Sequence, residues 1–248
     1  MLRMKKIELD KFEIPFKNDN DIESPYGYVC SQLSGDELVV ENPLGPSFVP
    51  ESFSLVNVMP KVEDQGQTPR CCAFALLSIC DYIYNANYSH IMKMSNWDAS
   101  TVDKTTAKTF GVNEIYENCK VQGGMMPITG INYLTNKGIK KADGEVFKIP
   151  QFAKVPNFEV MKYCIMVNGP VLLGMKCYQD AINGSHEFWN PRAGEYVGGH
   201  AVVAVGYTPK GFIIRNSWGS NWMNKGYAII PTQGMIDSVL EAWTPLFF

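Results

Sequence analysis

The fold of this chain is decided by residues 65–75, which read QGQTPRCCAFA, together with two later motifs, GHAV and NSWG. Cys71 lies in the first stretch, His200 in GHAV and Asn216 at the start of NSWG. The histidine follows the cysteine by 129 residues and the asparagine follows it by 145. This order is typical of a thiol nucleophile, its base and the group that orients the base.

Cys71 opens an apolar stretch without Gly or Pro that continues to Ile83, which predicts a buried helix with the cysteine in its first turn. A helix N-terminus carries partial positive charge and unpaired N–H groups, and both lower a thiol pKa. Arg70 adds a positive charge next to it. We therefore expect a thiolate at Cys71. Cys72 would point about 100° away around the helix, so we expect it to pack in the core.

A strand-like run begins at His200, a turn signal lies at 209–211, and a second apolar run covers 212–215. This pattern predicts a β-hairpin. The hairpin would bring His200 and Asn216 to the same end of a sheet, although they are 16 residues apart. The amide oxygen of Asn216 is then able to accept from the imidazole and select its tautomer.

Cap signals predict two further helices. One starts near Pro127 and ends before Gly138, and the other covers 158–167 after a cap at Asn157. From Val171 onward, strand signals dominate. The chain is therefore predicted to be of the α+β class, with a helical half that carries the cysteine and a β half that carries the histidine and asparagine.

These motifs resemble those of papain- and cathepsin-type cysteine proteases, and the match covers residues 49 to about 230. The resemblance implies a papain-like fold of two subdomains with a cleft between them, a helical one with Cys71 and a β-barrel-like one with His200 and Asn216. It also implies that residues 226–230 form the last core strand. The expected activity is that of a cysteine endopeptidase, which hydrolyses peptide bonds through a thioester.

The resemblance also implies the roles of individual residues. Gln65 and the backbone N–H of Cys71 would form an oxyanion hole, which stabilises charge on a carbonyl oxygen. The catalytic residues expected are Gln65, Cys71, His200 and Asn216. Glycines would pair with an extended substrate, one tryptophan would shield the His–Asn hydrogen bond, and another would line the leaving-group side. The substrate-binding residues expected are Gly123, Gly124, Gly199, Trp218 and Trp222.

The chain departs from the family at several positions. Val121 and Thr68 stand where those proteases have a disulfide pair, and this paired loss predicts a fold built without that bridge. Pro69 and Arg70 replace Gly-Ser, and Cys72 replaces a tryptophan. Two other functions stay open: a catalytically inactive papain-like binding or structural protein, and an acyl or amide transferase with the same triad.

The composition of the chain limits the kinds of molecule that we expect it to bind. The chain has 248 residues, of which 46% are hydrophobic and 19% charged, and its net charge is −3. These values indicate a globular protein with a large core and no affinity for nucleic acid. No apolar run is long enough for a membrane span, and no secretory signal is visible. We expect a polypeptide substrate, no metal or organic cofactor, and a cytoplasmic or otherwise reducing compartment for its seven cysteines. The oligomeric state is left open.

Residues 1–48 precede the match and are expected to be an N-terminal extension that packs on a catalytic domain of residues 49–248. One interpretation is a structural arm, and the other is a segment that covers the cleft, with residues 25–29 along Gly123 and Gly124. The arm is favoured. It would bury the apolar side chains Ile7, Leu9, Phe12 and Ile14.

Overall fold

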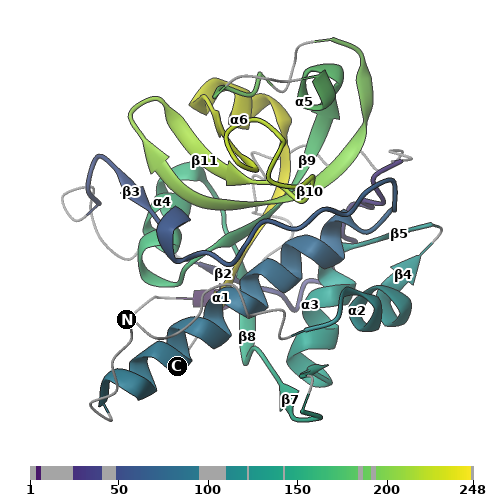
Figure 1. The fold of residues 1–248 in the computed structure, drawn as a ribbon, viewed down its shortest axis with the longest axis vertical. Coiled ribbons are helices and arrows are strands. Elements are labelled where there is room, and N and C mark those ends of the chain that lie inside the picture. The colour runs from purple at the N-terminus through teal and green to yellow at the C-terminus, as the bar shows by residue number, and fades with distance from the viewer. Residues whose placement is uncertain are drawn as a thin grey trace.

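The computed structural model describes residues 4–6, 25–40, 49–94, 110–121, 123–141, 143–183, 187–190 and 194–246. For residues 4–6, 86–94 and 183 only the backbone is described. The helices of residues 71–136 lie in the lower part of the view, and a curved sheet with the helices of residues 158–238 around it fills the upper part (Figure 1). The predicted helical and β-rich halves are therefore both present.

The helical half is organised around α1 (Cys71–Met94), which crosses the middle of the molecule (Figure 1). Two shorter helices, α2 (Val112–Cys119) and α3 (Pro127–Asn136), pack against it. Two small antiparallel ladders complete this half: β4 (Lys120–Val121) with β5 (Gly124–Met125), and β6 (Ile139–Lys140) with β7 (Val146–Phe147).

The predicted helix ends are confirmed. Helix α3 begins at Pro127, and Gly138 follows its end with a φ of +80°, donating its N–H to Tyr133 over 2.9 Å. Helix α4 (Phe158–Val167) has Asn157 as its N-cap, whose side chain accepts from the backbone N–H of Val160 at 2.9 Å. Local cap chemistry therefore determines both helices.

The main sheet has nine strands in the part of the chain that is described. Their order is β1-β2-β8-β13-β9-β10-β11-β12, and β3 pairs with β10. The predicted hairpin is confirmed as β10 and β11, which are antiparallel. The strands are β1 (Met4–Lys6), β2 (Leu38–Val40), β3 (Phe53–Ser54), β8 (Gln151–Lys154), β9 (Val171–Tyr178), β10 (Tyr196–Thr208), β11 (Gly211–Arg215), β12 (Tyr227–Ile230) and β13 (Val239–Leu246).

The prediction that residues 226–230 form the last core strand is wrong. Strand β12 forms there, but α6 (Thr232–Ser238) and β13 follow, and β13 lies between β8 and β9 with every residue buried. A charged residue and a proline argue against a central strand, and β13 contains both, at Glu241 and Pro245. The carboxylate is tolerated because it receives hydrogen bonds from Tyr28 and Trp243.

One continuous hydrophobic core joins the two halves. Leu76 and Ile79 of α1 lie in the same buried cluster as Leu172 of β9 and Val203 of β10. This packing holds the first turn of α1 against the sheet, which positions the site described below. None of the described helices is long and apolar enough to cross a membrane.

Candidate active site

Cys71 is the first residue of α1 and is fully buried. A turn precedes it, in which Thr68 donates both its N–H and its hydroxyl to the carbonyl of Gln65, at 3.3 and 2.6 Å. Its sulfur accepts the backbone N–H of Ala201 at 3.4 Å. The cysteine of the helical half therefore lies beside the residue that follows His200 on β10.

His200 and Asn216 are brought together by the pairing of β10 with β11. The Nε2 atom of His200 lies 2.8 Å from Oδ1 of Asn216, and the same oxygen accepts the backbone N–H of Ser217 at 2.8 Å. Because that oxygen is an acceptor, Nε2 must carry the proton. This leaves Nδ1 with a lone pair, and Nδ1 has no hydrogen-bond partner among the described residues.

Aromatic rings enclose the histidine. Trp218 stacks on His200 with ring centroids 4.7 Å apart, and Tyr26 meets the histidine edge-on at 5.2 Å. Trp222 packs edge-on against Trp218 at 5.7 Å, and its indole N–H donates to the carbonyl of Ala181. Trp218 thus stacks on the imidazole of His200, whereas Trp222 contacts Trp218. Their roles as shield and leaving-group wall stay predictions.

Gln65 lies within this network but its amide is engaged. Its Oε1 accepts the hydroxyl of Ser217 at 2.6 Å, and its Nε2 donates to the carbonyl of Thr68 at 2.8 Å. The backbone N–H of Gln65 donates to the carbonyl of Ser217 at 2.8 Å. These bonds hold Gln65 beside the asparagine loop, and its role in an oxyanion hole stays a prediction.

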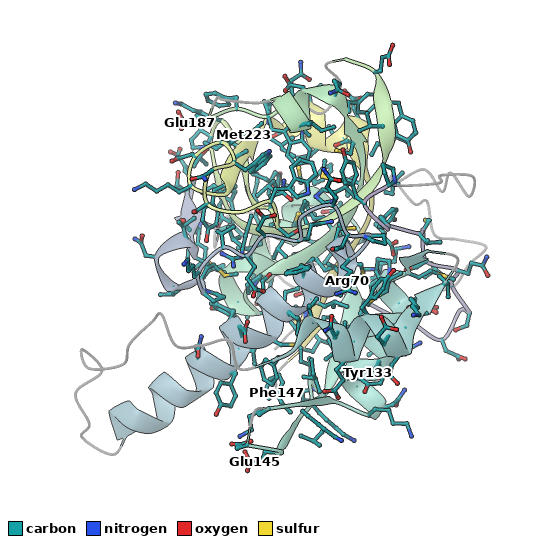
Figure 2. The ribbon with its side chains drawn as sticks, turned by 45° about the vertical axis from the view of Figure 1, so that its right-hand side comes forward. Arg70, Tyr133, Glu145, Phe147, Glu187 and Met223 are labelled. Carbon is teal, nitrogen blue, oxygen red and sulfur yellow. The ribbon has the colours of Figure 1, made fainter. Side chains whose placement is uncertain are left out.

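The expected thiolate is not supported by the electrostatics of this conformation. Burial raises the pKa of the Cys71 thiol to about 12 and lowers the pKa of His200 to about 4. Desolvation outweighs the helix terminus. The guanidinium of Arg70 turns toward α2, where it donates to Asn113 at 2.6 Å and lies 5.0 Å from the ring of Tyr116. Figure 2 shows Arg70 at the junction of the two halves.

The burial has an identifiable source in residues 25–29. The carbonyl oxygen of Tyr26 accepts the backbone N–H of Cys71 at 3.3 Å. The carbonyl of Gly27 accepts from Met125 at 2.7 Å, and Val29 donates back to Met125 at 3.2 Å. For these residues the preference for an arm away from the cleft is wrong, because their backbone pairs with β5 and caps the cysteine.

Glycines make this close approach possible. Gly27 has a φ of +83°, and a Cβ there would lie 1.9 Å from the carbonyl oxygen of Pro69. A Cβ on Gly124 would lie 2.5 Å from the carbonyl oxygen of Gly27, and one on Gly199 would lie 2.3 Å from the ring of Tyr28. Gly124 and Gly199 therefore contact the segment. Gly123 has open space around its Cβ position, and Gln122 lies outside the described residues.

None of the seven cysteines forms a disulfide, and all seven are within the part of the chain that is described. Cys72 is fully buried behind Cys71, as expected for a packing residue. The boundary at residue 48 stays a prediction, because residues 41–48 lie outside the described residues, as do Ile7, Leu9, Phe12 and Ile14.

Sequence reasoning missed Glu241 and Gly174 of the cleft. Glu241 is fully buried and accepts the hydroxyl of Tyr28 at 2.7 Å, while Gly174 lies against the ring of Tyr28. The one available signal was an acidic residue within the apolar run of β13. The sequence does not show which groups would bind this carboxylate, because Tyr28 reaches Glu241 only when the sheet is assembled.

Comparison with known proteins agrees with this geometry. A family model described as papain family cysteine protease matches residues 49–239. Papain from Carica papaya is 26% identical over 218 residues, which cover 81% of this chain and 59% of papain. Cathepsin K from Gallus gallus is 27% identical over 198 residues, which cover 68% of this chain and 54% of the relative. The chain thus spans about half the length of these curated relatives.

Solved structures share the fold. Xylellain, a cysteine protease from Xylella fastidiosa, superposes with a TM-score of 0.68 at 20% identity, covering 92% of this chain and 97% of that one. The bromelain protease from Ananas comosus, solved with the E64 inhibitor, gives a TM-score of 0.62 at 19% identity, covering 81% of this chain and 100% of that one. The chain belongs to the papain family of cysteine proteases.

Proposed function

We propose that the protein is a cysteine endopeptidase that hydrolyses peptide bonds through Cys71, His200 and Asn216. The observation that carries the proposal is the meeting of the two halves at the cysteine. Its sulfur lies 3.4 Å from the N–H of Ala201, next to a histidine whose Nε2 is held by Asn216. These contacts support the assignment of a nucleophile on α1, a base on β10 and, directly after β11, a group that orients the base.

The proposed reaction starts with transfer of the thiol proton to Nδ1 of His200, the ring nitrogen that has no partner in the described part of the chain. The sulfur of Cys71 then attacks the peptide carbonyl, and the backbone N–H of Cys71 stabilises the oxyanion. His200 protonates the leaving amine, which releases it and leaves a thioester. Water, deprotonated by His200, then hydrolyses the thioester and restores the thiol.

Substrate binding requires that residues 25–29 move. The N–H of Cys71 is already bonded to the carbonyl of Tyr26, and a substrate carbonyl has to replace it. Movement of Tyr26 also admits water to the thiol and to His200. Because burial is the leading cause of both pKa shifts, exposure lowers the pKa of the thiol and raises the pKa of the imidazole. Both changes favour the reactive ion pair.

The test combines labelling with turnover. The protein is treated with an epoxide-type thiol reagent, the labelled residue is mapped by mass spectrometry, and hydrolysis of fluorogenic peptides is measured. We expect labelling at Cys71 and hydrolysis that is lost in His200→Ala. Stoichiometric labelling with no hydrolysis of any peptide would indicate a binding protein or a transferase. Product analysis with added amines separates these two, since only a transferase yields amide adducts.

A further inference from the structure

The proposed mechanism accounts for only one end of the Asn216 amide. Its Oδ1 atom lies 2.8 Å from Nε2 of His200 and accepts the backbone N–H of Ser217 at 2.8 Å. Its Nδ2 atom is buried and has no hydrogen-bond partner among the described residues. Buried amide donors are nearly always paired, either with protein or with ordered water. The NH₂ end of this side chain therefore needs an acceptor.

A small cavity adjoins the asparagine. It lies where α1 packs on β10 and β11, and Asn216 is one of the residues that line it. The space inside it that is open to the centre of a water-sized sphere is about 10 Å³. A volume of this size holds about one water molecule. The cavity is thus too small for any larger ligand.

Two serine residues that line the cavity can act only as further acceptors. The hydroxyl of Ser78 donates to the carbonyl of Ala75 at 2.9 Å, and the hydroxyl of Ser217 donates to Oε1 of Gln65 at 2.6 Å. A hydroxyl has one hydrogen, and in both serines that hydrogen is already committed. The residues around the cavity therefore supply one donor, Nδ2 of Asn216, and two acceptors.

A single water molecule matches this set of groups, because it accepts from one donor and donates to two acceptors. Arg215 also lines the cavity, but a guanidinium carries only donors and cannot pair with Nδ2. The remaining side chain with acceptor oxygens around the cavity is that of Glu63. A direct bond from Asn216 to this carboxylate is the competing arrangement, and the first test below distinguishes it.

We propose that this cavity binds one water molecule, which accepts from Nδ2 of Asn216 and donates to the hydroxyl oxygen of Ser78, and that Ser78 is thereby a positioning residue for His200. The effect on turnover rests on the peptidase function proposed above. The bond from Nε2 of His200 to Oδ1 selects the tautomer whose lone pair is at Nδ1. A half-turn of the amide would offer Nδ2 to the imidazole and select the opposite tautomer. Holding the NH₂ end opposes this rotation.

The first test is a crystal structure of the full chain at a resolution that shows ordered water. We expect one water at about 2.9 Å from Nδ2 of Asn216 and within hydrogen-bond distance of the hydroxyl of Ser78. A direct bond from Nδ2 to Glu63, or an Nδ2 atom with no water beside it, would overturn the proposal. A water that contacts Nδ2 but not Ser78 would overturn the role of the serine.

The second test compares Ser78→Thr with Ser78→Val. Threonine and valine have nearly the same shape, and both are β-branched, but only threonine keeps a hydroxyl oxygen. We expect kcat for peptide hydrolysis to be about fivefold lower in Ser78→Val than in Ser78→Thr, as for the loss of one hydrogen bond. KM should be similar in the two, since Ser78 is buried and the water orients the base. Equal kcat values would contradict the positioning role, because a packing defect lowers both variants alike.

The third test does not depend on turnover. Nitrogen NMR of the histidine ring reports which nitrogen of His200 carries the proton. We expect the proton on Nε2 in the unaltered chain and in Ser78→Thr, and an increased share of the Nδ1 tautomer in Ser78→Val. The same tautomer ratio in all three proteins would overturn the positioning role.

These outcomes separate the two proposals. Hydrolysis with equal kcat in the two variants leaves the peptidase and removes the role of Ser78. The absence of cleavage of every peptide overturns the peptidase, and the crystal structure and the tautomer ratio then decide the water site alone. If Ser78→Val does not fold, the structure of the unaltered chain decides.

Discussion

The backbone N–H of Cys71 donates to the carbonyl oxygen of Tyr26 over 3.3 Å. The Tyr26 carbonyl thus already accepts the backbone N–H of Cys71, which a substrate carbonyl would need as its hydrogen-bond donor. A tethered occupant competes at high effective concentration, so weak individual contacts suffice to keep it in place. The segment that bears Tyr26 is therefore expected to control access to the thiol.

The nucleophile is the first testable assignment. Cys71→Ala should lower peptide hydrolysis by at least about three orders of magnitude, because no other group replaces the thioester route. Cys72→Ala should retain most of the activity, since its side chain is buried in the core. Thermal unfolding of both variants checks that they fold. Preferential alkylation of Cys72 over Cys71 would contradict the assignment.

Loosening the segment should expose the thiol. Tyr28→Phe removes one hydrogen bond to a carboxylate and should speed alkylation of Cys71 by about tenfold, if opening precedes labelling. Tyr133→Phe is a matched control, because it also removes a bond to a carboxylate, that of Glu114, on the helical half (Figure 2). Labelling is followed by mass spectrometry of the peptide that contains Cys71. Equal rates in the two variants would show that the hydroxyl does not hold the segment.

Gly124→Ala should displace the same segment sterically. The three atoms nearest to a Cβ at Gly124 all belong to Gly27 and Val29, the closest at 2.5 Å. We expect faster alkylation of Cys71 with little loss of overall stability. Gly111→Ala, where nothing lies within 4 Å of the new methyl, is the control and should label like the unaltered chain. Slower labelling in Gly124→Ala would contradict this account.

Stability should fall in acid because of His200. Burial lowers its pKa to about 4 from an ordinary value of 6.5, so the unfolded chain binds its proton first. The contribution is fully present above pH 6.5 and is lost as the pH falls toward 4. Its size is on the order of 3 kcal/mol. Urea unfolding from pH 7.5 to 4 measures this loss.

The control for the acid effect is His200→Gln, which cannot take up the proton. This variant should lose less stability than the unaltered chain over the same pH range. Parallel losses in both proteins would assign the acid sensitivity to other groups and contradict the role of His200.

The thiols give a separate prediction. We propose that the protein works in a reducing compartment, since Val121 and Thr68 stand where the related proteases have a disulfide pair. Thiol counting under denaturing, non-reducing conditions should therefore find seven reactive thiols in fresh material. Two or more stoichiometric disulfides in the native protein would contradict this proposal.

The parts of the fold that follow from local chemistry were predictable. Pro127 and Asn157 mark the starts of α3 and α4, and the turn at 209–211 marks the hairpin. Caps and turns are local, because their hydrogen bonds join residues that are close along the chain. The spacing of Cys71, His200 and Asn216 is also visible in the sequence alone, and it indicated the family.

The sequence by itself thus determined the two capped helices, the hairpin, the family and the candidate triad, but it did not reveal the central strand β13. Tertiary structure decided how that site is filled. Tyr26 and Cys71 are 45 residues apart, and Tyr28 and Glu241 are 213 apart, so no local pattern links them. Only the assembled sheet brings the carboxylate of Glu241 on β13 to the hydroxyl of Tyr28. The protonation of the site also depends on assembly, because burial, a property of the packed molecule, outweighs the helix terminus that the sequence shows.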